Sequence, residues 1–269
     1  MSVLSYDPAI SGELFRPLSS FVTADYGPAK VIARRVAMEL KSGWAVNIGF
    51  GISANVPRIL LEEGQHGKVT WVIEQGAVGG IPLLDFAFGC ASNAEAFVAS
   101  PHQFIYFQGG GFNCSLLSFL EIGADGSVNV SRLSATPHRT AGAGGFVDIT
   151  ARARKIVFSG TFNAGAKMRL ENNRLVIERE GKIAKFVPKV DQVSFSGKRA
   201  LEQGQDITYV TERCVIKLLK DGLTITEIAP GLDLQRDILD QAATALQVAK
   251  DVKQMDQRLF APEPIGLSL

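Results

Sequence analysis

The stretch Val69-Thr70-Trp71-Val72-Ile73 is an apolar run of β type that ends at a single acid, Glu74, followed by Gln75-Gly76-Ala77-Val78-Gly79-Gly80. We predict a buried strand that delivers one carboxylate into a turn with three glycines. A carboxylate exposed at a strand tip is a candidate covalent nucleophile. Because glutamates at strand ends are usually solvated and glycines often mark only a turn, this role needs support from other segments.

Upstream of this stretch, the pattern alternates between helix and strand. Apolar residues at helical spacing predict a helix from Pro28 to Leu40, and Trp44 to Ile48 predicts a short strand. The glycine turn Gly49 to Ser53 and a helix from about Ala54 to Glu63 follow. This alternation is typical of a parallel sheet with crossover helices, in which ligands sit at the carboxyl ends of the strands. Both glycine turns, at 49–53 and 74–80, lie at such ends.

The middle of the chain continues with apolar runs and glycine-dense loops. The run Phe104 to Phe107 ends in Gln108 and three glycines, and Leu116 to Ile122 predicts a strand whose hairpin partner is Val128 to Val130. The loop Ala141-Gly142-Ala143-Gly144-Gly145-Phe146 precedes a predicted helix from about Val147 to Ala153 and a strand from Lys155 to Ser159.

The last third of the chain predicts mainly antiparallel strands. Segments 175–193 and 205–228 alternate apolar residues with turns, a helix is expected from Asp233 to Leu246, and the tail is expected to be loose. The expected fold class is α/β, with an open, mostly parallel sheet, flanking helices and an antiparallel C-terminal extension. We expect residues 1–25 to form an N-terminal arm or short strand pair, and residues 26–269 to form one domain.

Composition excludes several classes of protein. With 269 residues, 46% of them hydrophobic, the chain can bury a substantial core, and a net charge of +1 gives no indication of nucleic acid as a partner. No apolar run is long enough to span a membrane, and Met1 to Phe15 do not resemble a secretory signal. A cytoplasmic location is therefore expected.

Cysteine and histidine do not indicate a metal site. Cys90, Cys114 and Cys214 are far apart and form no CxxC pair, and the three histidines, at 66, 102 and 138, show no ligand spacing. Cys114 follows the triple glycine and could be a nucleophile, but we interpret it as a small buried thiol.

The glycine loops suggest a floor of backbone N–H groups that faces the lone carboxylate. Such amides stabilise an oxyanion, and losing one donor costs acyl-transfer catalysis roughly 3 to 4 kcal/mol. Glycine permits the close approach, although any one of Gly49, Gly51, Gly144 and Gly145 could serve a tight turn alone. The loops fit neither a GxGxxG fingerprint nor a P-loop.

The string Val72 to Pro82, with its Glu74-Gln75-Gly76, resembles the Glu-Gln-Gly or Glu-Asn-Gly motif of family I coenzyme A transferases, in their β subunit or C-terminal half. Four further stretches agree in order, from about Lys30 to the C-terminus: Gly49 to Ile52, Gly126 to Ser131, Gly142 to Phe146 and Thr226 to Gly231.

The resemblance implies a ping-pong reaction in which Glu74 forms an acyl anhydride and then a glutamyl-CoA thioester. It also implies that the Gly145 N–H is an oxyanion donor and that Asn129 holds the substrate or orients Glu74. The implied contacts with CoA are Gly49, Phe50, Gly51, Ile52, Ser53 and Gly144, together with Lys167, which is equally well read as a surface lysine. CoA would be a substrate, and no permanently bound cofactor or metal is expected.

Because the fused members of the family carry another half of similar size, the resemblance also implies an α subunit as partner, in a heterotetramer or larger assembly. Short-chain acyl-CoA, 3-oxoacids and other small carboxylic acids are the implied substrates. Two alternatives stay open: a hydrolase of an acyl-CoA or a CoA-linked diketone, in which Glu74 activates water, and a non-catalytic subunit.

Overall fold

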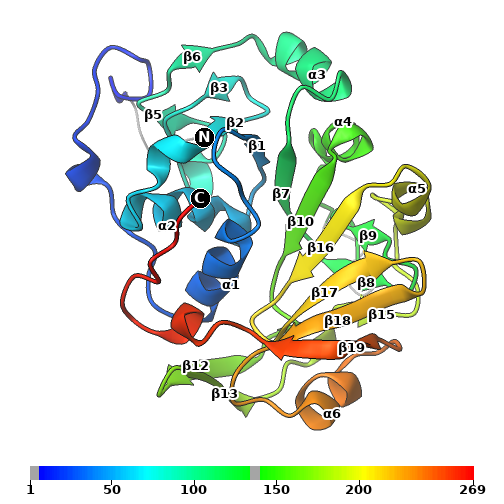
Figure 1. Cartoon of the computed structure of the whole chain (residues 1–269). Helices are drawn as coiled ribbons and strands as arrows, with labels where there is room; N and C mark the ends of the chain where they lie inside the picture. The colour runs from blue at the N-terminus through cyan, green and yellow to red at the C-terminus, as the bar shows by residue number, and fades with distance from the viewer. Residues whose placement is uncertain (1–5, 134–139) are drawn as a thin grey trace.

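The chain, seen here in a computed structural model that describes residues 6–133 and 140–269, is built on one ten-stranded sheet flanked by helices (Figure 1). The order across the sheet is β19-β18-β17-β16-β10-β7-β1-β2-β3-β6. In chain order these strands are β1 (Ala45–Ile48), β2 (Thr70–Val72), β3 (Ala77–Val78), β6 (Ala96–Phe97), β7 (Cys114–Ser118), β10 (Lys155–Ser159), β16 (Asp206–Val210), β17 (Cys214–Leu219), β18 (Gly222–Ile228) and β19 (Gln247–Gln254).

The centre of the sheet is parallel, as the alternation of helices and strands predicts. Strands β16, β10, β7, β1 and β2 all pair in parallel. Antiparallel pairs flank them, β16-β17-β18 on one side and β2-β3-β6 on the other. The carboxyl ends of β1, β7 and β10 therefore meet at one edge.

Within the two described ranges, four small sheets and six helices complete the fold. The small sheets pair β4 (Ile81–Pro82) with β5 (Ala91–Ser92), β8 (Glu121–Gly123) with β9 (Val128–Asn129) and β15 (Phe186–Val187), β11 (Asn163–Ala164) with β14 (Ile183–Ala184), and β12 (Lys167–Glu171) with β13 (Arg174–Arg179). The helices are α1 (Pro28–Ala37), α2 (Val56–Glu62), α3 (Ser100–Gln108), α4 (Phe146–Arg152), α5 (Gly197–Glu202) and α6 (Leu234–Asp237). Single 3-10 turns are η1 (Leu18–Ser20), η2 (Ile52–Asn55), η3 (His66–Lys68), η4 (Asp85–Ala87), η5 (Leu239–Gln241) and η6 (Gln257–Phe260).

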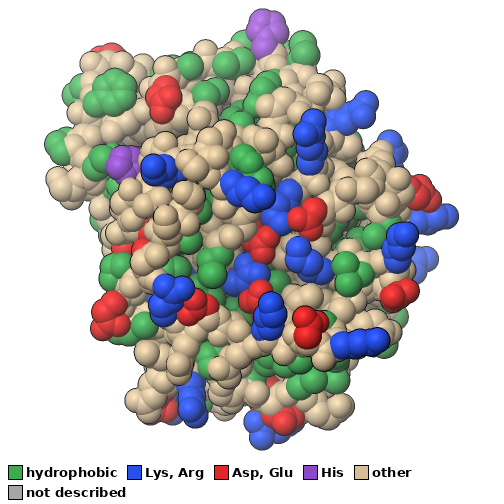
Figure 2. Space-filling view, in the orientation of Figure 1, with side chains coloured by type: hydrophobic (Ala, Val, Ile, Leu, Met, Phe, Trp, Pro, Cys, Tyr) green, Lys and Arg blue, Asp and Glu red, His purple; other side chains and the backbone are tan. Residues whose placement is uncertain are grey.

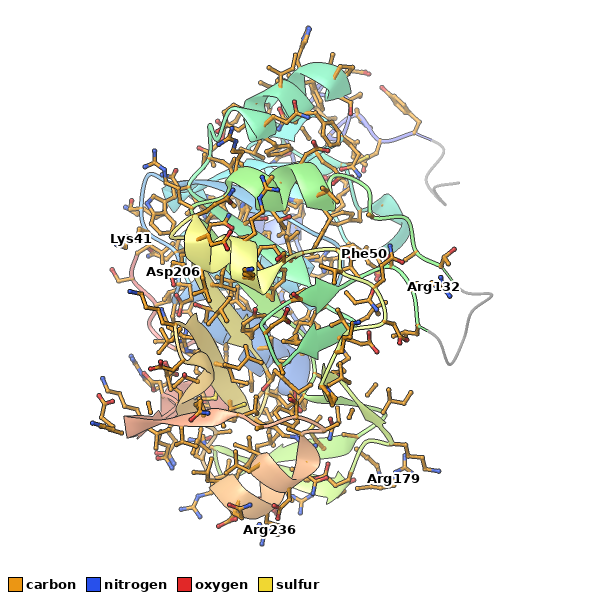
Figure 3. All side chains as sticks on the ribbon, turned by 90° about the vertical axis from the view of Figure 1, so that its right-hand side faces the viewer. Lys41, Phe50, Arg132, Arg179, Asp206 and Arg236 are labelled. Atoms are coloured by element: carbon orange, nitrogen blue, oxygen red, sulfur yellow. The ribbon has the colours of Figure 1, made fainter. Side chains whose placement is uncertain are left out.

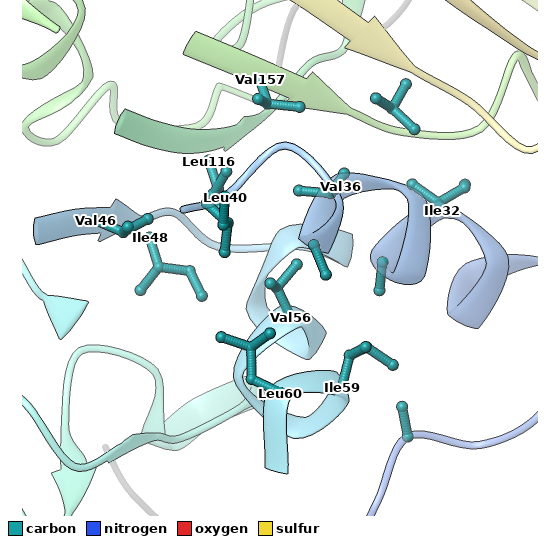
Figure 4. Packing of buried hydrophobic residues seen from close by; sticks show 14 of the residues in the cluster. Ile32, Val36, Leu40, Val46, Ile48, Val56, Ile59, Leu60, Leu116 and Val157 are labelled. Atoms are coloured by element: carbon teal, nitrogen blue, oxygen red, sulfur yellow. The ribbon is translucent and has the colours of Figure 1, made fainter. Parts of the chain in front are cut away.

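Helices cover both faces of the sheet. On one face, Ile32 and Val36 of α1 and Ile59 of α2 pack against Leu116 of β7 and Val157 of β10 (Figure 4). On the other face, residues of α3, α4 and α5 join a second cluster with Ile156 and Phe158 of β10. Because successive side chains of a strand point to opposite faces, β10 contributes to both clusters. The result is a three-layer core.

The chain departs from the sequence-based expectations in three segments. The expected strand at 116–122 is broken into β7 and β8, whereas the apolar run at 104–107, which had no assigned element, lies within helix α3. The helix expected from Asp233 to Leu246 is reduced to α6 and the 3-10 turn η5. The tail expected to be loose instead contributes β19, an edge strand parallel to β18.

The N-terminal residues have little regular structure. Of the described residues up to 25, only Leu18–Ser20 form a 3-10 turn, and the expected strand pair is absent from this part. Arg16 is held by two hydrogen bonds with Asn93, whose side-chain oxygen accepts the Arg16 N–H at 2.8 Å. The division into an arm and a domain at residue 25 stays a prediction.

On the face of the molecule shown in Figure 2, basic and acidic side chains are intermixed instead of forming a stripe of one sign. None of the helices in the two described ranges is both long and apolar enough to cross a lipid bilayer.

Candidate active site

Glu74 lies one residue after Ile73, beyond the carboxyl end of β2, on the turn that leads to β3. The turn depends on glycine: Gly76 has a φ of +115°, and a Cβ there would collide with the carbonyl oxygen of Val98. Gly79 and Gly80 also have positive φ values. These backbone angles are readily adopted only by glycine, so the sequence of the turn determines where Glu74 leaves the sheet.

The Glu74 side chain rests on the glycine loop that precedes α4. Its Oε2 atom accepts a hydrogen bond from the Gly145 N–H at 3.1 Å. Gly144 has a φ of +53°, and a Cβ built on it would lie 3.0 Å from Oε1; a Cβ on Gly145 would lie 2.7 Å from Oε2. The loop therefore needs glycine at both positions for the carboxylate to sit so close.

The environment of Glu74 alters its proton affinity. Partial burial raises the pKa of the carboxyl group above its usual value of 4.5, and the hydrogen bond from the Gly145 N–H opposes that rise because it stabilises the charged form. The group is thus a more basic carboxylate than one in water.

Glu74 lies on the wall of a cavity of about 400 Å³ at the carboxyl ends of the central strands. Segments from β1, β7 and the loop before α4 contribute most of the wall. The lining residues are Asn47, Ile48, Gly49, Phe50, Glu74, Phe88, Leu117, Ser118, Phe119, Leu120, Val130, Ala141, Gly142, Ala143, Gly144, Phe146 and Ile149.

The loop expected to contact CoA is divided between two environments. Gly49 and Phe50 line the cavity, and the exposed ring of Phe50 makes an edge-to-face contact with Phe88 at 5.6 Å between centroids. Gly51 and Ile52 line a smaller neighbouring hollow. Ser53 is buried, and its hydroxyl shares a 2.7 Å hydrogen bond with the hydroxyl of Ser159. This bond joins the 3-10 turn η2 to the last residue of β10.

Asn129 and Lys167 are not brought to Glu74. The buried Asn129 amide donates to Glu121 Oε2 at 2.7 Å and to the Arg132 carbonyl, and its oxygen accepts the N–H groups of Ser131 and Arg132. This network holds the segment that places Val130, the next residue, in the cavity wall.

Lys167 lies on β12, where it forms a 3.0 Å ion pair with Glu178 and its side chain is 70% exposed. It is paired across the hairpin with Arg179, which lies well below Phe50 in Figure 3.

Much of the cavity wall is formed by residues that the sequence did not single out. Leu117 and Ser118 are the last residues of β7, Phe119 and Leu120 follow it, and Asn47 and Ile48 close β1. The rule that ligands bind at such ends could have identified them, but only if the end of β7 had been placed correctly. No comparable pattern in the sequence identifies Phe88, Phe146 and Ile149 as lining residues.

The remaining candidate groups fit structural roles. Cys114 is fully buried, and its burial raises the pKa of the thiol to about 12, which makes it a poor nucleophile. His138 lies outside the described residues. In the described ranges, no group of three or more His, Cys, Asp or Glu side chains is arranged to hold a metal ion.

Known proteins that are similar in sequence to this chain are CoA-transferases. No protein-family model matches the chain. The caffeate CoA-transferase of Acetobacterium woodii is 42% identical over 264 residues, which are 97% of this chain and 50% of that protein. The acetate CoA-transferase subunit beta of Haemophilus influenzae is 25% identical over 237 residues, 84% of this chain and 94% of that subunit.

Among solved structures, the apoenzyme of the acyl-CoA transferase YdiF from Escherichia coli O157:H7 superposes with a TM-score of 0.90 at 35% identity. The match covers 99% of this chain and 49% of YdiF. The chain thus spans about half the length of the curated relatives that it matches first.

Proposed function

Since the chain belongs to the family I CoA-transferases, we propose that it is the β-type half of an enzyme that moves CoA between an acyl-CoA thioester and a free carboxylic acid. The observation that carries the proposal is the Glu74 carboxylate, which is bonded to the Gly145 N–H at 3.1 Å on the wall of a cavity of about 400 Å³. It combines a nucleophile, an oxyanion donor and room for an acyl group.

In the first step, Oε1 of Glu74 attacks the acyl carbonyl carbon, the C–S bond breaks, and CoA leaves as its thiolate. The product is a mixed anhydride between the acyl group and Glu74. The thiolate then attacks Cδ of Glu74, and the bond from Cδ to the bridging oxygen breaks. This releases the acyl group as a carboxylate and leaves a glutamyl-CoA thioester.

The hydrogen bond from Gly145 suits this second step. When the thiolate adds to Cδ, negative charge develops on Oε2, the oxygen that already accepts the Gly145 N–H. A donor that is in place before the charge forms needs no reorganisation, and one such donor contributes roughly 3 to 4 kcal/mol to an acyl transfer. An acceptor carboxylate completes the cycle by the same two steps in reverse.

The partner is part of the proposal. The chain matches nearly the full length of a protein named as a β subunit, and about half of longer single-chain transferases. We therefore infer that a complementary α-type half completes the site, on a separate chain or in the same polypeptide. Lys167, remote in the described structure, would reach CoA only if such an assembly brought them together.

The test is chemical trapping of the thioester. The chain, alone and co-expressed with a complementary half, is incubated with acyl-CoA and then with borohydride, which reduces a glutamyl thioester to an alcohol. We expect peptide mass spectrometry to locate the reduction at Glu74 and to find none in Glu74→Gln. The control Glu202→Gln makes the same exchange at an exposed position and should keep the reduction at Glu74. An active complex whose Glu74 stays unmodified would refute the mechanism.

The same samples separate transfer from hydrolysis. With an isotopically labelled acceptor acid, transfer places CoA on the labelled acid, whereas a hydrolase produces free CoA alone. If Glu74→Gln left the activity of a complex intact, the chain would be a non-catalytic subunit.

A further inference from the structure

Helix α3 contacts both of the segments that hold the Glu74 carboxylate. At the start of the helix, the Ser100 hydroxyl donates a 3.4 Å hydrogen bond to the main-chain carbonyl of Glu74. At its end, the Gln108 amide donates to Asp148 of α4 at 2.7 Å. The helix therefore lies beside α4 (Figure 1) and connects the turn that carries Glu74 to the helix that follows the glycine loop.

The residues just before α3 are attached to the same turn. The Val98 N–H donates to the Gly76 carbonyl at 2.8 Å, and a Cβ on Gly76 would lie only 2.0 Å from the Val98 carbonyl oxygen. Segment 98–108 is thus fixed on both sides of the contact between Glu74 and Gly145.

Between these two attachments, the ring of Phe104 packs on the contact itself. The point where a Cβ on Gly145 would lie is 2.9 Å from Cε1 and 3.0 Å from Cζ of Phe104, and it is 2.7 Å from Oε2 of Glu74. The ring and the carboxylate therefore approach the same side of Gly145. A side chain at Gly145 would displace one of them.

The Phe104 ring is supported by the aromatic core. It makes an edge-to-face contact with Phe107 at 6.3 Å between centroids, and Phe107 is fully buried and contacts Phe112 at 5.2 Å. Because such a core is closely packed, the position of the Phe104 ring is restrained from behind. Phe104 is not among the residues that line the cavity, so it can act on Glu74 without touching an acyl group bound there.

We propose that Phe104 is a positioning residue for the transfer reaction, whose ring prevents the Glu74 side chain from turning away from the Gly145 N–H before the substrate arrives. The inference rests on the proposed function for its chemistry. In the described ranges, the Gly145 N–H supplies the only hydrogen bond to this carboxylate, so packing must provide the remaining restraint. A glutamate side chain has several rotamers, and a wall that excludes the others fixes the carboxylate in advance of the reaction.

The test compares two substitutions at Phe104 in the chain co-expressed with a complementary half. In Phe104→Ala, we expect the rate of thioester formation at saturating acyl-CoA to fall about tenfold or more, because the carboxylate is no longer held at its donor. The acyl-CoA concentration that gives half of the maximal rate should change less than about twofold, because no cavity contact is lost. Phe104→Leu refills most of the space and should restore the rate to within about threefold of the unaltered chain.

Ile105→Ala is the matched control on the same helix. Ile105 is the next residue and is 64% exposed, so the exchange shortens a side chain of α3 without removing the packing on Gly145. We expect it to keep both the maximal rate and the half-saturating concentration.

A second measurement does not depend on turnover. Because the Gly145 N–H is bonded to Glu74, its exchange with water, followed by NMR on the full chain, reports how firmly the carboxylate is held. We expect this exchange to be about fivefold faster or more in Phe104→Ala and in Glu74→Ala, and unchanged in Ile105→Ala.

Several outcomes would overturn the role of Phe104. They are a full maximal rate or an unchanged Gly145 exchange in Phe104→Ala, a loss that appears in the half-saturating concentration instead of the rate, a Phe104→Leu variant as slow as Phe104→Ala, and an equal loss in Ile105→Ala. If the Gly145 exchange responds as expected but the unaltered complex forms no thioester, Phe104 still positions Glu74 and the proposed transfer mechanism fails.

Discussion

At the scale of single residues, the acid–base behaviour of Glu74 governs its chemistry. Only the ionised carboxylate is a nucleophile, and partial burial raises its pKa above 4.5 although the Gly145 N–H opposes the rise. We therefore expect the rate of thioester formation to decline as the pH falls, with a midpoint above pH 4.5. The measurement is the initial rate of borohydride-trappable product between pH 4 and pH 8.

Unfolding of the protein at acidic pH would also lower the rate and must be distinguished from protonation of Glu74. Samples held at each acidic pH and returned to pH 7 should recover full activity, which separates protonation from unfolding. A rate that stays constant down to pH 4.5 would mean that Glu74 is not the group that titrates.

At the scale of elements, the loop before α4 determines how closely Glu74 is held. In Gly144→Ala, the new Cβ would lie 3.0 Å from Oε1 while the residue keeps a φ of +53°. We expect a cost of about 1 kcal/mol in stability from the backbone angle and a loss of tenfold or more in thioester formation from the displaced carboxylate.

Gly165→Ala is the matched control for that loop. Gly165 also has a positive φ, +81°, but no atom lies within 4 Å of the position of its Cβ. It should lose similar stability in urea unfolding and keep its rate of thioester formation. Equal losses of rate in the two variants would mean that strain, not contact with Glu74, impairs Gly144→Ala.

At the scale of the whole molecule, one arginine connects the two ends of the fold. The fully buried Arg34 of α1 donates to the carbonyls of Leu259, Ala261 and Glu263, at 3.3, 2.6 and 2.7 Å. The C-terminal segment is thereby held across the helix layer that supports the central strands (Figure 1).

We expect Arg34→Ala to destabilise the protein by about 3 kcal/mol or more, because it removes the donor of three carbonyls, one of them fully buried, and opens a cavity where the buried guanidinium lay. Urea unfolding measures the loss, and limited proteolysis should show faster cleavage within residues 256–269. Arg236→Ala removes a guanidinium whose side chain is 73% exposed and paired with Asp237, and should cost less than about 1 kcal/mol. Similar losses in the two variants would contradict this role for Arg34.

Local patterns in the sequence were sufficient to predict the helices and strands at the start of the parallel sheet. Alternating helix and strand signals predicted α1, β1, α2 and β2 within a few residues, because hydrophobic periodicity and glycine stops are local properties. Local pattern misassigned the segments that depend on distant partners. The tail was expected to be loose, but its residues 247–254 form β19 because β18 offers an edge with which they can pair.

The amino-acid sequence by itself determined the lone Glu74, its glycine turn and the glycine loop at 142–145, since each is a short motif with a direct backbone requirement. Only the tertiary structure decided that Gly145 bonds to Glu74, that Asn129 and Lys167 lie elsewhere, and that apolar side chains from four segments enclose the carboxylate. The physical reason is that these contacts join residues up to 71 positions apart, and their distances are set by how the sheet and the helices pack.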